Sequence, residues 1–511
     1  MADTRTIPWW KADQQQSGLS TDLEHDIVVQ REAIPLVFVP GIMGTRLRRS
    51  GTSGTGTGTN GLPNLRWDPG DGGFMWKHYI GAGGAERRRL VVGEPAEYFD
   101  PGFLEVDNTN PVRDGFYGIM KDYTKFLNPL KNHDWGDLAK IFEFPVYAVG
   151  YNWSDSNENS GRKLVDRIKE IIAEAKDVTG LCEKVILITH SMGGIVSRAA
   201  SELAGGRSLI IGIVHGVQPV TGAPAAYWRM KAGFEGTDSL GMVQKALGNN
   251  GPKVTAVLGN IPGGLQLLPT KNHRNNHNQA FWLTLRNDDG VFFTAPKHGD
   301  PYEEIYRVKA VVEPANDDAP APSGNAYWGL VDPALLNPAF VPPSTGNAHD
   351  ALDAAAAPAA DPWDKYLEVL KIAETFHDKM GLKMHPYTLC LRGTGHDTAD
   401  TIELRVERRM MKRTSYPNQG FRGYFTDDKG KHRVAVLQDP SRQSDGTGDG
   451  DGTVVLSSAA ALDKAGRPDP GDQSMDVEHQ PAYESGAVQE WAFNVIRALC
   501  KLRYYEKHGG S

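Results

Sequence analysis

The length, composition and charge of this chain limit what it can be. With 511 residues it exceeds the usual size of one hydrophobic core, so we expect a catalytic domain with large insertions or a second domain. Apolar residues make up 40% and charged residues 23%, which is typical of soluble globular proteins and excludes wholesale disorder. The net charge of -8 argues against a nucleic-acid partner, because phosphate binding requires a basic surface.

The cysteines and the N-terminal sequence indicate where the chain is made. The chain has three cysteines, Cys182, Cys390 and Cys500, which lie far apart in sequence and form no CxxC motif. An odd number at this spacing predicts neither a disulfide framework nor a metal site. Residues 1–18 contain no apolar run that resembles a signal peptide, and no 18 apolar residues follow one another anywhere. We therefore expect synthesis in a reducing cytosol, without a signal peptide or a transmembrane segment.

The first half of the chain alternates apolar runs with helical periodicity. Residues 34–39, 144–150, 184–189 and 208–217 read as strands, and the first of these ends at a Pro-Gly turn. Between them, apolar residues recur at helical spacing over residues 164–175. Strands alternating with helices predict βαβ units and therefore an α/β fold with a mostly parallel sheet.

The second half of the chain is less regular. Aromatic, Pro-rich and Ala-rich stretches predict an insertion that caps the core, and within it residues 363–380 have helical spacing. A helix packed on its own core is favoured there over a membrane-facing lid. Strand pattern returns at residues 432–437 and 453–458, and an amphipathic helix over residues 488–499 ends the chain.

These patterns divide the chain into four parts. We expect, in chain order, an N-terminal extension (1–30), a first part of the core (31–224) with a mobile Gly/Thr-rich loop at 48–64, a cap or lid (225–430), and a second part of the core (431–511).

Ser191 is the predicted nucleophile. The segment ILITHSMGG places it where a buried strand turns sharply into a helix, a turn that exposes a serine oxygen and needs small neighbours. Gly193 supplies one such neighbour at +2, whereas Thr189 replaces the usual glycine at -2. The start of the helix leaves the Met192 N–H free to serve as an oxyanion donor. His190 is expected to orient the turn. The alternative is a Gly-rich turn without a catalytic role.

Chain order selects the other two members of a triad. In such folds the acid and then the histidine follow the serine. His479 precedes the last amphipathic helix and is the predicted base, whereas His508 lies in a charged tail. Asp451, flanked by glycines that permit a tight turn, is the predicted acid, with Asp449 as its nearest competitor.

The same acidic stretch also resembles a calcium loop. Asp445, Thr447 and Asp449 alternate and Gly450 follows, but an EF-hand needs glutamate at the twelfth position, where this chain has Leu456. We therefore expect no EF-hand, no metal and no cofactor, while other aspartate-based calcium sites and a plain solvated turn stay open.

Four ordered motifs resemble a known group of enzymes. VPGIMGTRL (39–47), THSMGG (189–194), GNIPGGLQLLP (259–269) and GDGTV (450–454) occur in the order seen in lecithin:cholesterol acyltransferase-like lipases and the related PGAP1-like α/β-hydrolases. The resemblance implies an α/β-hydrolase fold, with helices on both faces of a mostly parallel sheet and a large cap insertion.

The resemblance also implies roles for individual residues. The turn after the first strand would donate the Met43 N–H to the oxyanion hole, beside that of Met192. The aspartate of the GDGTV-like motif is Asp451, and the histidine shortly before a terminal helix is His479. These assignments agree with those from chain order, and they complete a catalytic set with Ser191.

The implied activity is hydrolysis of acyl esters in membrane phospholipids or glycerides through an acyl-enzyme. Residues 219–236 and the insertion are similar to antibacterial lipase effectors of bacterial type VI secretion. That similarity implies synthesis in a bacterial cytoplasm, action in the periplasm of a target cell, a cognate immunity protein and a secretion-apparatus partner. An acyltransferase, a deacylase of lipid-anchored proteins and a catalytically silent binding module are the alternatives.

Overall fold

A computed structural model of the chain describes fourteen stretches, which are residues 3–9, 25–52, 56–58, 61–108, 111–112, 116–234, 242–287, 289–310, 328–340, 360–407, 422–426, 432–437, 447–463 and 471–508. Its centre is a six-stranded, entirely parallel sheet. In spatial order the strands are β11 (Val146–Ala148), β4 (Leu36–Val39), β12 (Val185–His190), β13 (Ile210–Gly216), β16 (Thr388–Thr394) and β22 (Gln473–Asp476).

Helices cover both faces of this sheet. Along β4, Val37 and Val39 face one apolar cluster with helices α4 (Asn157–Thr179) and α5 (Met192–Glu202), whereas Leu36 and Phe38 face a second cluster. The second cluster contains helices α3 (Thr124–Lys131) and α13 (Gly486–His508). This alternation explains why the central strands read as continuous apolar runs, since both of their faces are buried.

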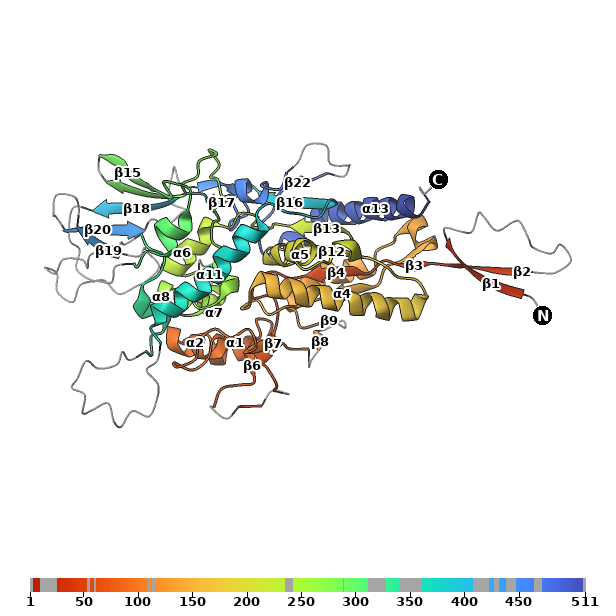
Figure 1. The fold of residues 1–511 in the computed structure, drawn as a ribbon, viewed down its shortest axis with the longest axis horizontal. Helices are drawn as coiled ribbons and strands as arrows, with labels where there is room; N and C mark the ends of the chain where they lie inside the picture. Colours follow the sequence, from red (N-terminus) through yellow and green to blue (C-terminus); the bar gives the residue numbers. More distant parts are fainter. Residues whose placement is uncertain are drawn as a thin grey trace.

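The N-terminal residues lie at one end of the sheet. Strand β1 (Asp3–Pro8) pairs in parallel with β2 (His25–Gln30), and both termini lie at this end in Figure 1. Trp9 is buried, stacks on Tyr504 of α13 and meets Phe142 edge to face. Phe142 belongs to β10 (Phe142–Glu143), which pairs with β3 (Glu32–Ala33) beside the core.

The part of the chain between β4 and α3 forms a small lobe. It contains β5 (Leu47–Arg49), β6 (Leu65–Trp67) and β7 (Leu104–Val106) in one antiparallel sheet, with helices α1 (Gly72–His78) and α2 (Gly84–Val91) and the pair β8 (Pro111–Val112) and β9 (Phe116–Tyr117). Part of the Gly/Thr-rich loop is folded, because the Gly58 N–H bonds the Leu62 carbonyl and the Asn64 N–H bonds the Gly56 carbonyl. Mobility of this loop stays a prediction.

The predicted cap region is built from helices and a second sheet. The helices are α6 (Pro224–Ala232), α7 (Met242–Leu247), α8 (Gly251–Leu258), α9 (Pro262–Leu265), α10 (Pro333–Leu336) and α11 (Pro362–Met380). The sheet has the order β15 (Gly290–Ala295), β14 (Leu283–Asn287), β18 (Ile402–Glu407), β20 (His432–Leu437) and β19 (Arg422–Thr426). In Figure 1 this sheet and α6 and α8 lie at the end opposite to the two termini.

Helix α11 packs against protein, as the core-helix interpretation predicted. Tyr366, Leu370, Ala373 and Phe376 are fully buried, or nearly so, and join the apolar cluster that also contains α4 and α5. A single continuous cluster on this face therefore joins the cap to the central sheet.

One strand prediction was wrong, a second gave the right strand but the wrong sheet, and several strands were not predicted. Residues 432–437 do form a strand, but it belongs to the second sheet, because an apolar run cannot say which sheet it joins. Residues 453–458 form a turn and the short helix α12 (Leu456–Ala459). The central sheet instead takes its fifth strand from β16, which lies inside the range predicted as cap.

Candidate active site

Ser191 lies on a strained turn between β12 and α5. Its backbone angles, φ 52° and ψ -125°, are ones that a residue with a side chain rarely adopts. Gly193 is required here, because a Cβ at that position would lie 2.3 Å from the Val39 carbonyl oxygen. Thr189, the departure from the usual pattern, is accommodated by a hydrogen bond between its hydroxyl and His215 Nδ1 at 3.0 Å.

His479 lies between Ser191 and Asp451. Its Nε2 is 2.9 Å from Ser191 Oγ, and its Nδ1 is 2.8 Å from Asp451 Oδ2. In this arrangement Nδ1–H donates to the carboxylate and Nε2 accepts from the hydroxyl, which is the tautomer that a general base needs. Asp451 and His479 follow Ser191 in sequence by 260 (451 - 191) and 288 (479 - 191) positions. In the structure the three residues form one hydrogen-bonded chain.

Backbone groups fix the carboxylate of Asp451. Its Oδ1 accepts hydrogen bonds from the N–H groups of Thr453 and Val454 at 2.9 and 2.6 Å, which leaves Oδ2 for the histidine. The His479 N–H also bonds the Asp451 carbonyl at 2.9 Å, so the two loops are joined through main chain as well. Gly452 has φ 83°, a conformation that explains the glycine in this tight turn.

The competing residues lie in other environments. Asp449, in β21 (Thr447–Gly450), accepts a hydrogen bond from the Gly395 N–H at 2.7 Å. Its strand pairs with β17 (His396–Ala399), whereas an EF-hand would need a loop there, and Asp445 lies outside the described residues. His508 packs on Trp9 at the end of the sheet that carries the termini.

The two predicted oxyanion donors flank the serine turn. Met192 is the first residue of α5, so its N–H has no acceptor within the helix. Met43 has φ 62° in the turn after β4, and its carbonyl is held by Trp67 Nε1 at 2.7 Å. Met43 thus lies in the turn after β4 and Met192 at the start of the helix that follows Ser191, and their role as oxyanion donors stays a prediction.

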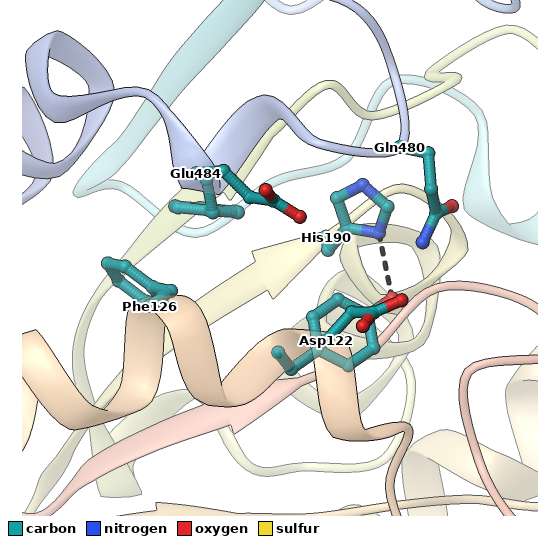
Figure 2. A pocket seen from close by; sticks show the side chains of 7 residues that line it. Asp122, Phe126, His190, Gln480 and Glu484 are labelled. Atoms are coloured by element: carbon teal, nitrogen blue, oxygen red, sulfur yellow. Dashed lines mark hydrogen bonds between the residues drawn. The ribbon is translucent and has the colours of Figure 1, made fainter. Parts of the chain in front are cut away.

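His190 and Tyr123 make hydrogen bonds that the sequence did not predict. His190 Nε2 lies 2.9 Å from the His479 carbonyl oxygen, and its Nδ1 lies 3.0 Å from the Tyr123 hydroxyl. The dashed line in Figure 2 marks the second of these hydrogen bonds. Burial, aided by the nearby His479, lowers the pKa of His190 to about 3, so this ring is neutral. Tyr123 precedes α3 and carries no local motif, so no sequence signal pointed to it.

The GNIPGGLQLLP motif has a packing role. A Cβ on Gly263 would lie 2.1 Å from the Trp153 carbonyl oxygen, so only glycine allows this close approach. Gln266 Oε1 accepts hydrogen bonds from both the N–H and the side-chain amide of Asn157 at the start of α4. The motif therefore holds α9 of the cap region against the loop that begins α4.

Comparisons with known proteins agree with this architecture. Residues 157–239, which include Ser191, match the family described as PGAP1-like alpha/beta domain. The structure resembles that of a chain in the Tle4-Tli4 complex with a TM-score of 0.68 and 22% sequence identity, over 93% of this chain and 99% of that one. This is an α/β-hydrolase fold. The predicted fold class and the predicted resemblance to PGAP1-like α/β-hydrolases are confirmed.

Other similarities are weaker. Bacillus licheniformis lipase BlEst2 aligns in its mature form with a TM-score of 0.18 and in its propeptide form with 0.16, each at 13% identity. These alignments cover 45% and 46% of this chain and 62% and 34% of the respective lipase chains, and such scores are too low to indicate a common fold. Among curated proteins, no sequence matches this chain.

Two features are absent from the part of the chain that the structure describes. Within it, no group of three or more His, Cys, Asp or Glu side chains is arranged to hold a metal ion. No helix there combines the length and the apolar character needed to cross a bilayer.

Proposed function

We propose that this protein is a serine hydrolase that cleaves acyl esters of membrane lipids, as a lipase or a phospholipase. The observation that carries the proposal is the hydrogen-bonded chain from Ser191 through His479 to Asp451, which begins on a strained strand-to-helix turn. A serine with an adjacent base, and a base oriented by a buried carboxylate, form the set required for nucleophilic catalysis.

The reaction follows from this geometry. His479 Nε2 accepts the proton of Ser191 Oγ as that oxygen attacks the ester carbonyl, and Asp451 stabilises the imidazolium that results. The N–H groups of Met43 and Met192 stabilise the oxyanion. His479 then protonates the departing alcohol, which leaves an acyl-enzyme. Water, deprotonated by the same histidine, attacks the acyl-enzyme, releases the fatty acid and restores the serine.

The lipid substrate is proposed from the resemblance of the four sequence motifs to lipases. We propose that α6 to α11 and the second sheet act as the cap, since they follow β13 and lie at the end of the molecule away from the termini. Loops or domains that close over a bound substrate exclude water from the reacting groups.

The test is to compare the wild type with Ser191→Ala on a fluorogenic fatty-acyl ester and on bacterial phospholipids. Loss of the nucleophile is expected to lower kcat about 10⁶-fold if the triad acts as a unit. Mass spectrometry of the products should show free fatty acid and lysophospholipid with the wild type alone. A Ser191→Ala variant that retains most of its activity would end the proposal.

The same experiments separate the alternatives. A new ester that forms only when an alcohol is supplied would indicate an acyltransferase, and release of fatty acid from an acylated protein would indicate a deacylase. A catalytically silent binding module would not form a covalent adduct with a fluorophosphonate probe, whereas a competent Ser191 would.

We further propose that the enzyme is an antibacterial effector of type VI secretion, made in the bacterial cytoplasm and active in the periplasm of a target cell. The sequence resemblance to such effectors and the fold shared with a chain of the Tle4-Tli4 complex support this role. Because that chain was solved in a complex, we also propose a protein partner here, an immunity protein, besides a component of the secretion apparatus.

Expression in two compartments tests the effector role. The wild type should be harmless in the cytoplasm and toxic when it is exported to the periplasm, and Ser191→Ala should be harmless in both. Equal growth of cells that export the wild type and the variant would contradict the effector role while leaving the hydrolase proposal intact.

A further inference from the structure

A chain of hydrogen bonds links the two sides of the candidate active site behind the serine. The Gly41 N–H lies 3.0 Å from the Tyr123 hydroxyl oxygen, and that hydroxyl lies 3.0 Å from His190 Nδ1. The other ring nitrogen, His190 Nε2, lies 2.9 Å from the His479 carbonyl oxygen. Gly41 belongs to the turn that carries Met43, so the chain runs from the predicted oxyanion turn to the predicted base.

The partners determine the direction of every hydrogen bond in this chain. A carbonyl oxygen only accepts, so His190 must donate from Nε2 to His479. Burial keeps the His190 ring neutral, with its pKa lowered to about 3, so Nδ1 carries no proton and accepts from the Tyr123 hydroxyl. The tyrosine oxygen in turn accepts from the Gly41 N–H. Each donor and acceptor thus has one consistent role.

The surrounding residues hold the two side chains in place. The Tyr123 ring packs on Phe38 of β4 at a centroid distance of 4.9 Å, and both are buried. Beside His190, the Tyr483 hydroxyl donates to the Thr189 carbonyl at 3.0 Å. Figure 2 shows the hollow next to this arrangement, whose lining includes Gln480, the residue after His479.

This arrangement also explains why small residues occupy the oxyanion turn. A Cβ at position 44 would lie 2.9 Å from the Tyr123 ring and hydroxyl, and a Cβ at position 41 would lie 2.9 Å from His190 Nδ1. Gly41 and Gly44 therefore let the turn approach the two side chains closely enough to be held by them. Neither glycine has a positive φ, so space rather than backbone conformation requires them.

We propose that Tyr123 and His190 are positioning residues that set the location of the His479 backbone relative to the oxyanion turn. Their hydrogen bonds go to the backbone of Gly41 and His479 and not to a reacting atom, so they act through these loops. The His190 ring also lies beside the His479 ring, with the two centroids 5.3 Å apart. The inference rests on the proposed triad. Displacement of a catalytic group by about 1 Å can cost about 10²-fold in rate, so an effect on kcat is expected without loss of the triad itself.

Two substitutions at position 190 separate the bonds of this chain. In His190→Gln, the amide nitrogen can reach the place of Nε2 and donate to the His479 carbonyl. In His190→Asn, the shorter side chain can accept from Tyr123 but cannot reach His479. We expect His190→Asn to lower kcat about 10²-fold with KM changed less than about threefold, and His190→Gln to lower kcat less than about tenfold.

Tyr123→Phe breaks the chain at its middle and leaves the Gly41 N–H without its acceptor. We expect a reduction in kcat of about tenfold, since the histidine side of the chain keeps its contact with His479. Tyr366→Phe is the matched control, because it removes another buried hydroxyl-to-carbonyl hydrogen bond, to Tyr306 in the cap region at 2.7 Å. That control should lower the melting temperature and leave kcat within about twofold.

The outcomes separate this inference from the proposed function. If Ser191→Ala abolishes activity while His190→Asn and His190→Gln have the same kcat, the positioning role is overturned and the hydrolase remains. If kcat falls in all variants only in proportion to the folded fraction measured by circular dichroism, the residues are structural and the inference is again overturned. If Ser191→Ala retains activity, the proposed function itself fails.

Discussion

The nucleophile turn and the cap region are stabilised in different ways. Around Ser191, positions are set by the backbone, through a positive φ and through close approaches that only glycine allows, as at Gly193. In the cap region, charged side chains join segments that are far apart in sequence. The difference teaches that short motifs can specify a candidate active site, whereas the predicted cap region depends on contacts that leave no local sequence pattern.

Two groups of charges illustrate how the cap region is held. Glu374 of α11, which is 7% exposed, pairs with Arg307 and Lys371. The guanidinium of Arg87 on α2 donates to the carbonyls of Lys245 and Ala246 in α7, which ties the small lobe to the cap region. Burial lowers the pKa of Arg87 to about 10, which leaves it charged at neutral pH.

The largest expected effect comes from altering a side chain of the proposed triad without altering the backbone around it. Asp451→Asn keeps an oxygen for the N–H groups of Thr453 and Val454 but no longer fixes the His479 tautomer, so kcat is expected to fall about 10⁴-fold. Steady-state kinetics measures the loss. Asp449→Asn, in the same acidic stretch, is the control, and an equal loss there would mean that Asp451 is not the acid.

The second prediction tests whether the turn that carries Ser191 requires a residue without a side chain at position 193. In Gly193→Ala, the added Cβ would lie 2.3 and 2.4 Å from the carbonyl oxygens of Val39 and Pro40, so we expect about 1–3 kcal/mol of destabilisation and a displaced Ser191. Urea denaturation measures the stability. Gly486→Ala, where a Cβ meets nothing within 4 Å, should change it by less than about 0.5 kcal/mol. Similar values for both variants would contradict the space argument.

A third effect, on stability alone, concerns the charges of the predicted cap region. Glu374→Gln weakens hydrogen bonds to cations and should lower the free energy of unfolding by about 1.5–3 kcal/mol at neutral pH. Glu368→Gln, on the same helix with an exposed carboxylate paired to Lys365, should cost less than about 1 kcal/mol. Urea denaturation compares the two, and equal losses would show that burial of Glu374 adds nothing.

The pH dependence of the Glu374 effect has a definite sign. Hydrogen bonds from Arg307 and Lys371 outweigh burial and lower the pKa of Glu374 from 4.5 to about 2. A lowered pKa means that the stabilisation is complete above about pH 4.5 and is lost as the pH falls towards 2. The stability difference between the wild type and Glu374→Gln should therefore shrink over this range. A difference that grows on acidification would contradict this assignment.

The sequence predicted those strands and site residues whose pattern lies within one short segment of the chain. Strands β4, β12 and β13 were predicted because strands buried on both faces give continuous apolar runs. Motif and chain order selected Ser191, Asp451 and His479, and His479 lies within hydrogen-bonding distance of each of the other two.

The rest depended on long-range contacts. Strand β16 has few apolar residues outside its centre, so its place in the central sheet was not visible in the sequence. Tyr123 and His190 are hydrogen-bonded although 67 positions separate them in sequence, and no local sequence pattern predicts that contact. The second sheet was missed for the same reason, because pairing partners are chosen by the tertiary structure.

The contacts of Arg198 determine whether a segment of this chain can be removed. Arg198, which is buried on the same helix as the nucleophile turn, donates to the carbonyls of Gly381 and Lys383 just after α11. A shortened chain that lacks the segment between β13 and β16 would lose both acceptors and retain an unpaired guanidinium inside the core, at a high cost in free energy. The helix that carries Ser191 is thus built to fold together with that segment, and the segment is not a detachable module.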